Sequence, residues 1–116
     1  MTTAIIANLE KMLGGPRDGA LLRYSLGNEW LKVGEPAKAA ACFREAVKRD
    51  AKYSAAWKLL GNALAESGDI QAALDAYEQG LSVAEGKGDI QAAREMKVFA
   101  KRLRKQLDEG TSKASV

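Results

Sequence analysis

The chain repeats itself at a fixed spacing, and this period restricts the possible folds more than any other feature. The segment LGN at residues 26–28 recurs at residues 60–62. At the same spacing, small residues meet small residues and one ring meets another: Gly34 and Gly68, Ala39 and Ala73, Phe43 and Tyr77, Ala46 and Gly80. A period of about 34 residues, with the residue types of helices and turns, predicts stacked helix–turn–helix units.

The residue types at these positions suit closely packed helix pairs. Gly27 and Gly61 remove a side chain where the first helix of each pair would lie against the second, and Ala39 and Ala73 do the same from the other side. Gly34 and Gly68 are expected to end the first helix of each unit, because glycine tolerates left-handed backbone geometry.

These residues resemble the tetratricopeptide repeat family, whose motif reads W-x2-L-G-x2-Y, then A-x3-F, then P. The second repeat supplies Trp57, Leu60, Gly61, Leu64, Ala73 and Tyr77, and the first supplies Leu26, Gly27, Trp30, Ala39 and Phe43. Arg23 stands in place of the first tryptophan, and Ala51 and Glu85 replace the closing prolines. The resemblance implies an all-α fold, a right-handed α-solenoid of antiparallel helix pairs with about six helices.

The hexapeptide GDIQAA occurs at residues 68–73 and again at 88–93. We interpret both copies as helix starts, because glycine can end one helix and aspartate can cap the next. The second copy follows a helix expected to run through about residue 84 and a loop at 85–88. It reflects either reuse of start chemistry or a third repeat with a longer loop, in which Lys97, Ala100, Lys101 and Arg104 occupy the motif positions.

The predicted organisation is one domain over residues 1–109. It comprises an N-terminal capping helix at 3–13, repeat 1 at 20–53, repeat 2 at 54–87 and a C-terminal capping helix at 89–108; a disordered tail is expected at 110–116. The apolar residues expected to cover the repeats are Ile5, Leu9, Met12 and Leu13 at one end, and Ile90, Ala93, Val98, Ala100, Leu103 and Leu107 at the other.

The composition argues against catalysis. The 116 residues include no histidine and one cysteine, Cys42, so no general base of the commonest kind stands beside a nucleophile, and no zinc-binding cluster exists. We therefore expect neither enzymatic activity nor a cofactor nor a metal. The apolar run at residues 4–7 is too short for a signal peptide or a membrane span, which predicts a cytoplasmic protein.

The family resemblance implies a concave groove, formed by the first helices of successive repeats, that holds a peptide or a partner helix. The implied groove residues are Tyr24, Asn28, Leu31 and Lys32 from repeat 1, Lys58, Asn62 and Glu66 from repeat 2, and Arg102 from the final helix. In members that grip the terminal carboxylate of chaperone tails, a lysine and an asparagine at the Lys58 and Asn62 sites form part of the clamp. Tyr24 and Phe99 depart from that clamp. Asn28 and Asn62 are equally well explained as structural amides that bond a neighbouring helix.

Charge indicates the kind of partner. Residues 94–105 carry six basic side chains against one glutamate, whereas the whole chain is at +3. We expect a non-catalytic interaction module with an acidic protein or peptide ligand, and nucleic acid is disfavoured because no stacking platform accompanies the charges. A solvated capping face explains the same residues. The alternative function is that of a self-assembling, homodimeric structural or regulatory helical repeat protein. The expected oligomeric state is a monomer or a weak homodimer.

Overall fold

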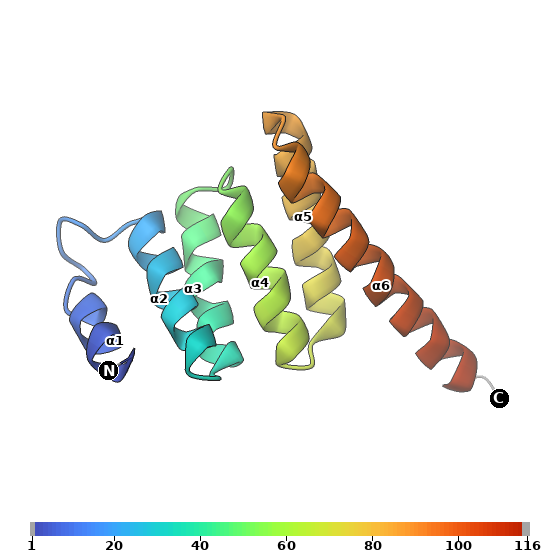
Figure 1. Cartoon of the computed structure of the whole chain (residues 1–116), viewed down its shortest axis with the longest axis horizontal. Coiled ribbons are helices and arrows are strands. Elements are labelled where there is room, and N and C mark those ends of the chain that lie inside the picture. The colour runs from blue at the N-terminus through green and yellow to red at the C-terminus, as the bar shows by residue number, and fades with distance from the viewer. Residues whose placement is uncertain (1, 115–116) are drawn as a thin grey trace.

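The computed structural model describes residues 2–114, and every regular element in that range is an α-helix. The helices are α1 (Thr2–Glu10), α2 (Ala20–Lys32), α3 (Pro36–Arg49), α4 (Ser54–Glu66), α5 (Ile70–Lys87) and α6 (Ile90–Ala114). They lie side by side in chain order, as Figure 1 shows, and form an elongated stack of 52 × 31 × 20 Å. The prediction of an all-α solenoid with about six helices is confirmed.

Left-handed glycines stand just after α2, α4 and α5. Gly34 has φ +77°, Gly68 has φ +89° and Gly88 has φ +74°. Asp69 then caps α5 by accepting a hydrogen bond from the Ala72 amide at 3.2 Å, and Asp89 makes the equivalent bond to α6 from the Ala92 amide at 3.3 Å. Both copies of GDIQAA are therefore helix starts, as predicted.

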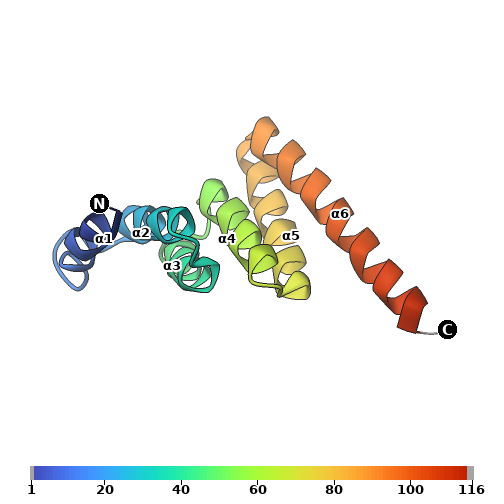
Figure 2. The ribbon, with the colours of Figure 1, turned by 60° about the horizontal axis from the view of Figure 1, so that its bottom comes forward.

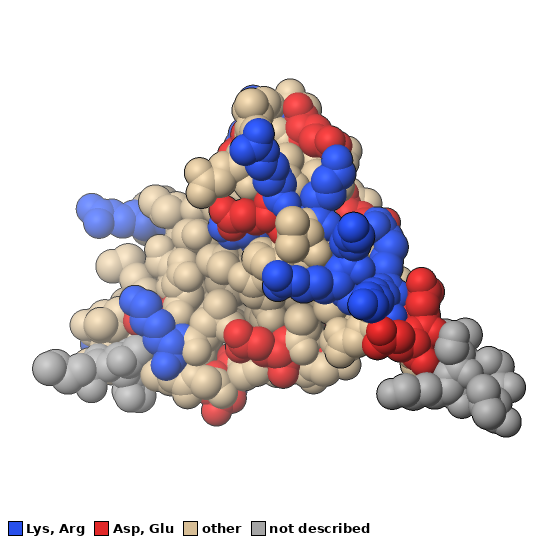
Figure 3. Space-filling model, turned by 45° about the vertical axis from the view of Figure 1, so that its right-hand side comes forward, with Lys and Arg blue, Asp and Glu red and all other residues tan. Residues whose placement is uncertain are grey.

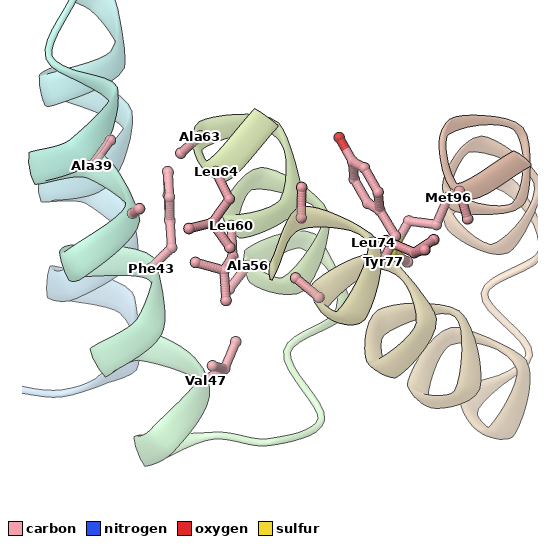
Figure 4. Close-up of a cluster of buried hydrophobic side chains, with 14 of the residues drawn as sticks. Ala39, Phe43, Val47, Ala56, Leu60, Ala63, Leu64, Leu74, Tyr77 and Met96 are labelled. Atoms are coloured by element: carbon pink, nitrogen blue, oxygen red, sulfur yellow. The ribbon is translucent and has the colours of Figure 1, made fainter. Parts of the chain in front are cut away.

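The core of both repeats is a ring packed on a glycine. A Cβ added to Gly27 would lie within 3.0 Å of the Phe43 ring, and one added to Gly61 would lie as close to the Tyr77 ring. Phe43 is fully buried, and in Figure 4 it extends from α3 towards Leu60 and Leu64 of α4. Glycine at these two positions lets the first and second helices approach closely enough to bury both rings.

The final helix occupies the position of a third first helix. The buried residues Ala56, Leu60 and Ala63 of α4 recur on α6, at one constant and longer offset, as Met96, Ala100 and Leu103. We call this the α4–α6 offset. We call α2, α4 and α6 the first helices, and α1, α3 and α5 the second helices. α6 diverges from the stack towards its C-terminal end (Figures 1 and 2).

Three predicted boundaries differ from the structure. α5 continues through residues 85–87, which were expected to form a loop, and ends at the left-handed Gly88. α6 continues through Ala114 instead of ending at 108, so residues 110–114 of the expected disordered tail are helical; residues 115 and 116 lie outside the described residues. α1 ends at Glu10, not at 13. Adding a residue to an existing helix costs much less than starting one, which explains the two extensions.

Some of the residues predicted to cover the repeats are exposed instead. Ile5 and Met12 are exposed, and the side chain that α1 buries is Ile6, one repeat length before the buried Ala40. On α6, Ile90 and Val98 are exposed. Met96, which was not predicted, is fully buried against the position of Gly80, so the face that α6 turns to the core is centred on a different residue.

Arg23, the residue at the missing tryptophan position, holds the loop between α1 and α2. Its Nε and Nη2 donate to the two carboxylate oxygens of Asp18, both at 2.9 Å, and the Gly14 amide donates to Asp18 Oδ2 at 2.9 Å. The hydrogen bond from the Arg23 guanidinium, followed by that from the Gly14 amide, lowers the pKa of Asp18 to about 2. The motif departure at Arg23 thus replaces an aromatic filler with a tether for the N-terminal helix.

Candidate peptide-binding groove

Two direct contacts connect successive first helices. Tyr24 of α2 stacks on Tyr53, the residue that precedes α4, with ring centroids 4.8 Å apart and planes at 29°. Lys58 Nζ of α4 lies 2.9 Å from Glu95 Oε2 of α6. Because Tyr24 and Lys58 are equivalent in the repeat frame, the same strip of the surface runs along all three first helices.

The predicted groove residues of repeat 1 are partly occupied by structural contacts. Tyr24 is half-buried and also lies against the Phe43 ring at a centroid distance of 5.8 Å. Asn28 is half-buried one turn further along α2, and Leu31 packs against the core. Lys32 is exposed, and its amine reaches Glu29 of its own helix at 3.1 Å. Tyr24 and Asn28 therefore remain the candidates for ligand contact in this repeat.

The predicted groove residues of repeat 2 are more tightly engaged. The Tyr77 hydroxyl donates to Asn62 Oδ1 at 2.5 Å, which supports the structural interpretation of that asparagine while leaving its amide nitrogen as a donor. Burial, followed by the negative charge of Glu66, raises the pKa of Tyr77 to about 12, so the hydroxyl stays protonated and able to donate at neutral pH. Glu66 itself is exposed at the end of α4.

Glu95 is the groove residue that the sequence reasoning missed. Its carboxylate accepts from Lys58 and, at 3.3 Å, from Gln91 Nε2, and the hydrogen bond from Lys58 is the main cause that lowers its pKa. The available signal was that Glu95 is the one acidic residue in the basic stretch 94–105. A groove with Lys58 already paired to a carboxylate is less positive than the sequence suggested.

Arg102 is exposed on α6, two turns beyond Glu95. α6 diverges from the stack towards its C-terminal end (Figure 1), and Arg102 is further along that helix than Glu95, which joins α6 to Lys58 of α4. The structure therefore brings Lys58 together with Glu95, while Arg102 extends the strip away from that pair.

The remaining chemistry of the described residues is sparse. Burial raises the pKa of the half-buried Cys42 thiol, which opposes formation of the nucleophilic thiolate at neutral pH. In the part of the chain that the structure describes, no group of three potential metal ligands gathers. Over the same residues, no helix has the length and apolar character needed to cross a membrane.

The paired helices, the ring-on-glycine contacts and the shared strip of first-helix residues define an α-helical repeat protein. The sequence profile of the tetratricopeptide repeat matches residues 24–90. A TPR repeat-containing protein of Pseudomonas aeruginosa is 48% identical over 99 residues, which are 85% of this chain and 94% of that protein. The chain belongs to the tetratricopeptide repeat family, and this membership indicates a scaffold for protein–protein interaction.

Solved structures agree with this assignment. The solution structure of a protein from Bordetella parapertussis superposes with a TM-score of 0.74 at 38% identity, covering 88% of this chain and 89% of that one. The crystal structure of the Sgt2 TPR domain from Aspergillus fumigatus superposes with a TM-score of 0.80 at 26% identity, covering 96% of this chain and 71% of that domain.

Proposed function

We propose that this protein is a non-catalytic, cytoplasmic interaction module that binds an acidic peptide or a C-terminal carboxylate along the strip from Tyr24 to Arg102. The observation that carries the proposal is the Lys58–Glu95 ion pair at 2.9 Å. Glu95 stands where the carboxylate of a ligand would lie, and an incoming carboxylate can take its place on Lys58. The side chain of Lys58 is 27% exposed and that of Glu95 is 35% exposed, so both are accessible from solvent.

Neighbouring groups extend the site in both directions. Lys58 and Asn62 are one helical turn apart on α4 and so face the same strip, and the Asn62 amide nitrogen can donate to a peptide carbonyl. Asn28 offers an amide at the equivalent position of repeat 1, beside the stacked Tyr24 and Tyr53 rings. Arg102 can form a two-pronged contact with a carboxylate further along the ligand.

The test is binding to an array of short acidic peptides, each made with a free and with an amidated C-terminus. The double variant Lys58→Glu, Arg102→Glu should weaken binding of the selected peptides by roughly tenfold or more, since charge-assisted contacts are worth about 1.5–3 kcal/mol each. Glu95→Gln should strengthen binding, because it removes the negative charge that competes with the ligand carboxylate for Lys58. Binding that ignores both the double reversal and Glu95→Gln would show that the concave strip is not the site.

Self-assembly is the second candidate, and the exposed apolar side chains at the two ends of the solenoid favour it. Ile5 and Met12 are exposed at the N-terminal end, and Ile90 is exposed on α6. Among the described residues, one end of the solenoid presents the second helix α1 and the other presents the first helix α6, so described units stacked head to tail would continue the alternation of helix types. Sedimentation across a concentration series decides between the candidates: a mass of 12.4 kDa throughout would eliminate self-assembly.

A further inference from the structure

The C-terminal end of the solenoid carries a cavity between α5 and α6, separate from the concave strip. Its volume is about 290 Å³. Leu81 and Ala84 of α5 and Ile90 and Ala93 of α6 form its apolar lining, with Glu85 and Asp89 at one end and Arg94 and Lys97 at the other. Sites for drug-sized molecules start at about 300 Å³ and bury most of the ligand, so this open cavity better fits side chains of a macromolecular partner.

The cavity lies where the helix alternation calls for another second helix. On α4, Trp57 and Gly61 face α5: a Cβ added to Gly80 of α5 would lie within 3.0 Å of Trp57 Cβ, and Gly61 lies against Tyr77 of α5. At the α4–α6 offset, Trp57 and Gly61 correspond to Lys97 and Lys101 of α6. The face of α4 that α5 covers is therefore the face that α6 leaves open.

The charged residues on this open face are all positive. The α4 residues Ser54, Trp57, Gly61 and Leu64 correspond on α6 to Arg94, Lys97, Lys101 and Arg104, all four of them exposed. Figure 3 shows basic side chains gathered on the side of the molecule where α6 lies. Within the described residues, Arg104 pairs with Glu78 at 2.8 Å, whereas Arg94, Lys97 and Lys101 make no ion pair. A face that served only to keep the end soluble would be expected to mix both signs.

We propose that this end surface binds an amphipathic helix of a protein partner, one with small apolar residues on one face and acidic residues in its N-terminal half. The proposal is independent of the concave strip. A helix in the next second-helix position runs antiparallel to α6, as α5 runs antiparallel to α4. Tyr77 and Gly80, which lie beside Gly61 and Trp57 of α4, are the eighth and eleventh of the 18 residues of α5. The first half of the partner helix therefore lies beside Lys101 and Arg104, its middle beside Lys97, and its last turns beside Glu85 and Asp89. Acidic residues near a helix N-terminus also suit the helix dipole.

The test uses two synthetic helical peptides, matched to α5 in length at 18 residues. Both carry the same leucine and alanine face; one has glutamates in its first half and lysines in its second, and the other has these halves exchanged. The full-length protein, labelled with ¹⁵N, is titrated with each peptide. The acidic-first peptide should bind, with amide shifts in residues 81–97, and should bind roughly tenfold more tightly than its isomer.

Charge variants locate the site. Lys97→Glu with Lys101→Glu should weaken binding of the acidic-first peptide roughly tenfold. Ile90→Ser should weaken binding of both peptides. Lys11→Glu with Arg17→Glu is the matched control, because both residues are exposed at the opposite end of the solenoid. The concave-strip variant Lys58→Glu, Arg102→Glu should bind the acidic-first peptide normally, so the two proposed surfaces can fail separately.

Several results would overturn the proposal. These are no binding of the acidic-first peptide at about 1 mM, equal affinity for the two isomers, or amide shifts confined to α1 or to the concave strip. A concentration-dependent mass that Lys97→Glu with Lys101→Glu abolishes would assign the same surface to a second copy of the chain, and would equally exclude the acidic partner helix.

Discussion

The two repeats build the same contact and then use it differently. In repeat 1 the ring on Gly27 is Phe43, and in repeat 2 the ring on Gly61 is Tyr77. The two rings differ by one hydroxyl, and that hydroxyl binds Asn62. Asn28, the equivalent asparagine, faces a phenylalanine and has no such bond available.

The comparison teaches that equivalent positions in a repeat need not have equivalent roles. Asn62 uses its carbonyl oxygen to hold a second helix, whereas both ends of the Asn28 amide remain for a ligand or for water. The residue one turn earlier differs as well: Tyr24 stacks on a ring, and Lys58 pairs with a carboxylate. A peptide lying along the strip would meet aromatic surface and a free amide in repeat 1, and a displaceable ion pair in repeat 2.

Removing either ring should have the largest effect on stability. Phe43→Ala and Tyr77→Ala should each lower the free energy of unfolding by about 3–5 kcal/mol, because each leaves a large void in the core. Urea denaturation measures the loss. Gly27→Ala in the Phe43→Ala background should be milder than Gly27→Ala alone, because the ring that it would strike is gone. Additive losses would mean that the glycine and the ring are not coupled.

Adding a methyl group at the glycines beneath the two rings should destabilise the two repeats by different amounts. Gly27→Ala and Gly61→Ala should each cost about 1–3 kcal/mol by overpacking. Gly61→Ala should be the worse, because Tyr77 is tied to Asn62 and cannot shift as Phe43 can. Gly86→Ala is the control: this helical glycine has nothing within 4 Å of an added Cβ, so the variant should be neutral or stabilised by up to about 1 kcal/mol. Equal losses of stability at Gly27 and Gly61 would show that the Tyr77–Asn62 hydrogen bond does not add to the cost of overpacking.

The sequence predicted these contacts because they depend on the repeat period, and it failed where the period ends. In the short α1, Ile5 and Ile6 are neighbours about 100° apart around the helix, so either could face the core, and the packing of α1 on α2 selects Ile6. Glu95 was missed because its contact with Lys58 depends on how α6 is inclined to α4. α6 follows α4 at the longer α4–α6 offset rather than at the repeat period, so the internal repeat contains no earlier copy of the contact.

Tyr77→Phe makes repeat 2 resemble repeat 1 and should cost about 1 kcal/mol at neutral pH, the value of one hydrogen bond. The pKa of Tyr77 is raised from 10 to about 12 in the folded protein. The unfolded chain therefore ionises first, and the stabilisation by the protonated hydroxyl, complete below pH 10, is lost as the pH rises towards 12. Across this pH interval the free energy of unfolding, measured by urea denaturation, should fall less steeply for Tyr77→Phe than for the wild type. The reciprocal Phe43→Tyr serves as the comparison, and an unchanged alkaline slope in Tyr77→Phe would count against a buried, protonated Tyr77 hydroxyl as the source of the slope.

The smallest effect is expected at the Lys58–Glu95 pair, where repeat 2 has a charge in place of the aromatic contact of repeat 1. Glu95→Gln keeps a hydrogen-bond acceptor for Lys58 and should cost only about 0.2–1 kcal/mol, the usual range for a partly exposed pair. The loss should disappear in high salt, because screening already weakens the wild-type pair. The lowered pKa of Glu95 means that the stabilisation is present above the ordinary carboxyl range and is lost as the pH falls through the folded pKa, so wild type and variant should converge in acid. Glu78→Gln removes the more exposed pair with Arg104 and should change stability less. A loss at Glu95 that persists in both salt and acid would mean that the side chain supports α6 by packing, and that no carboxylate needs to be displaced from Lys58 when a peptide binds.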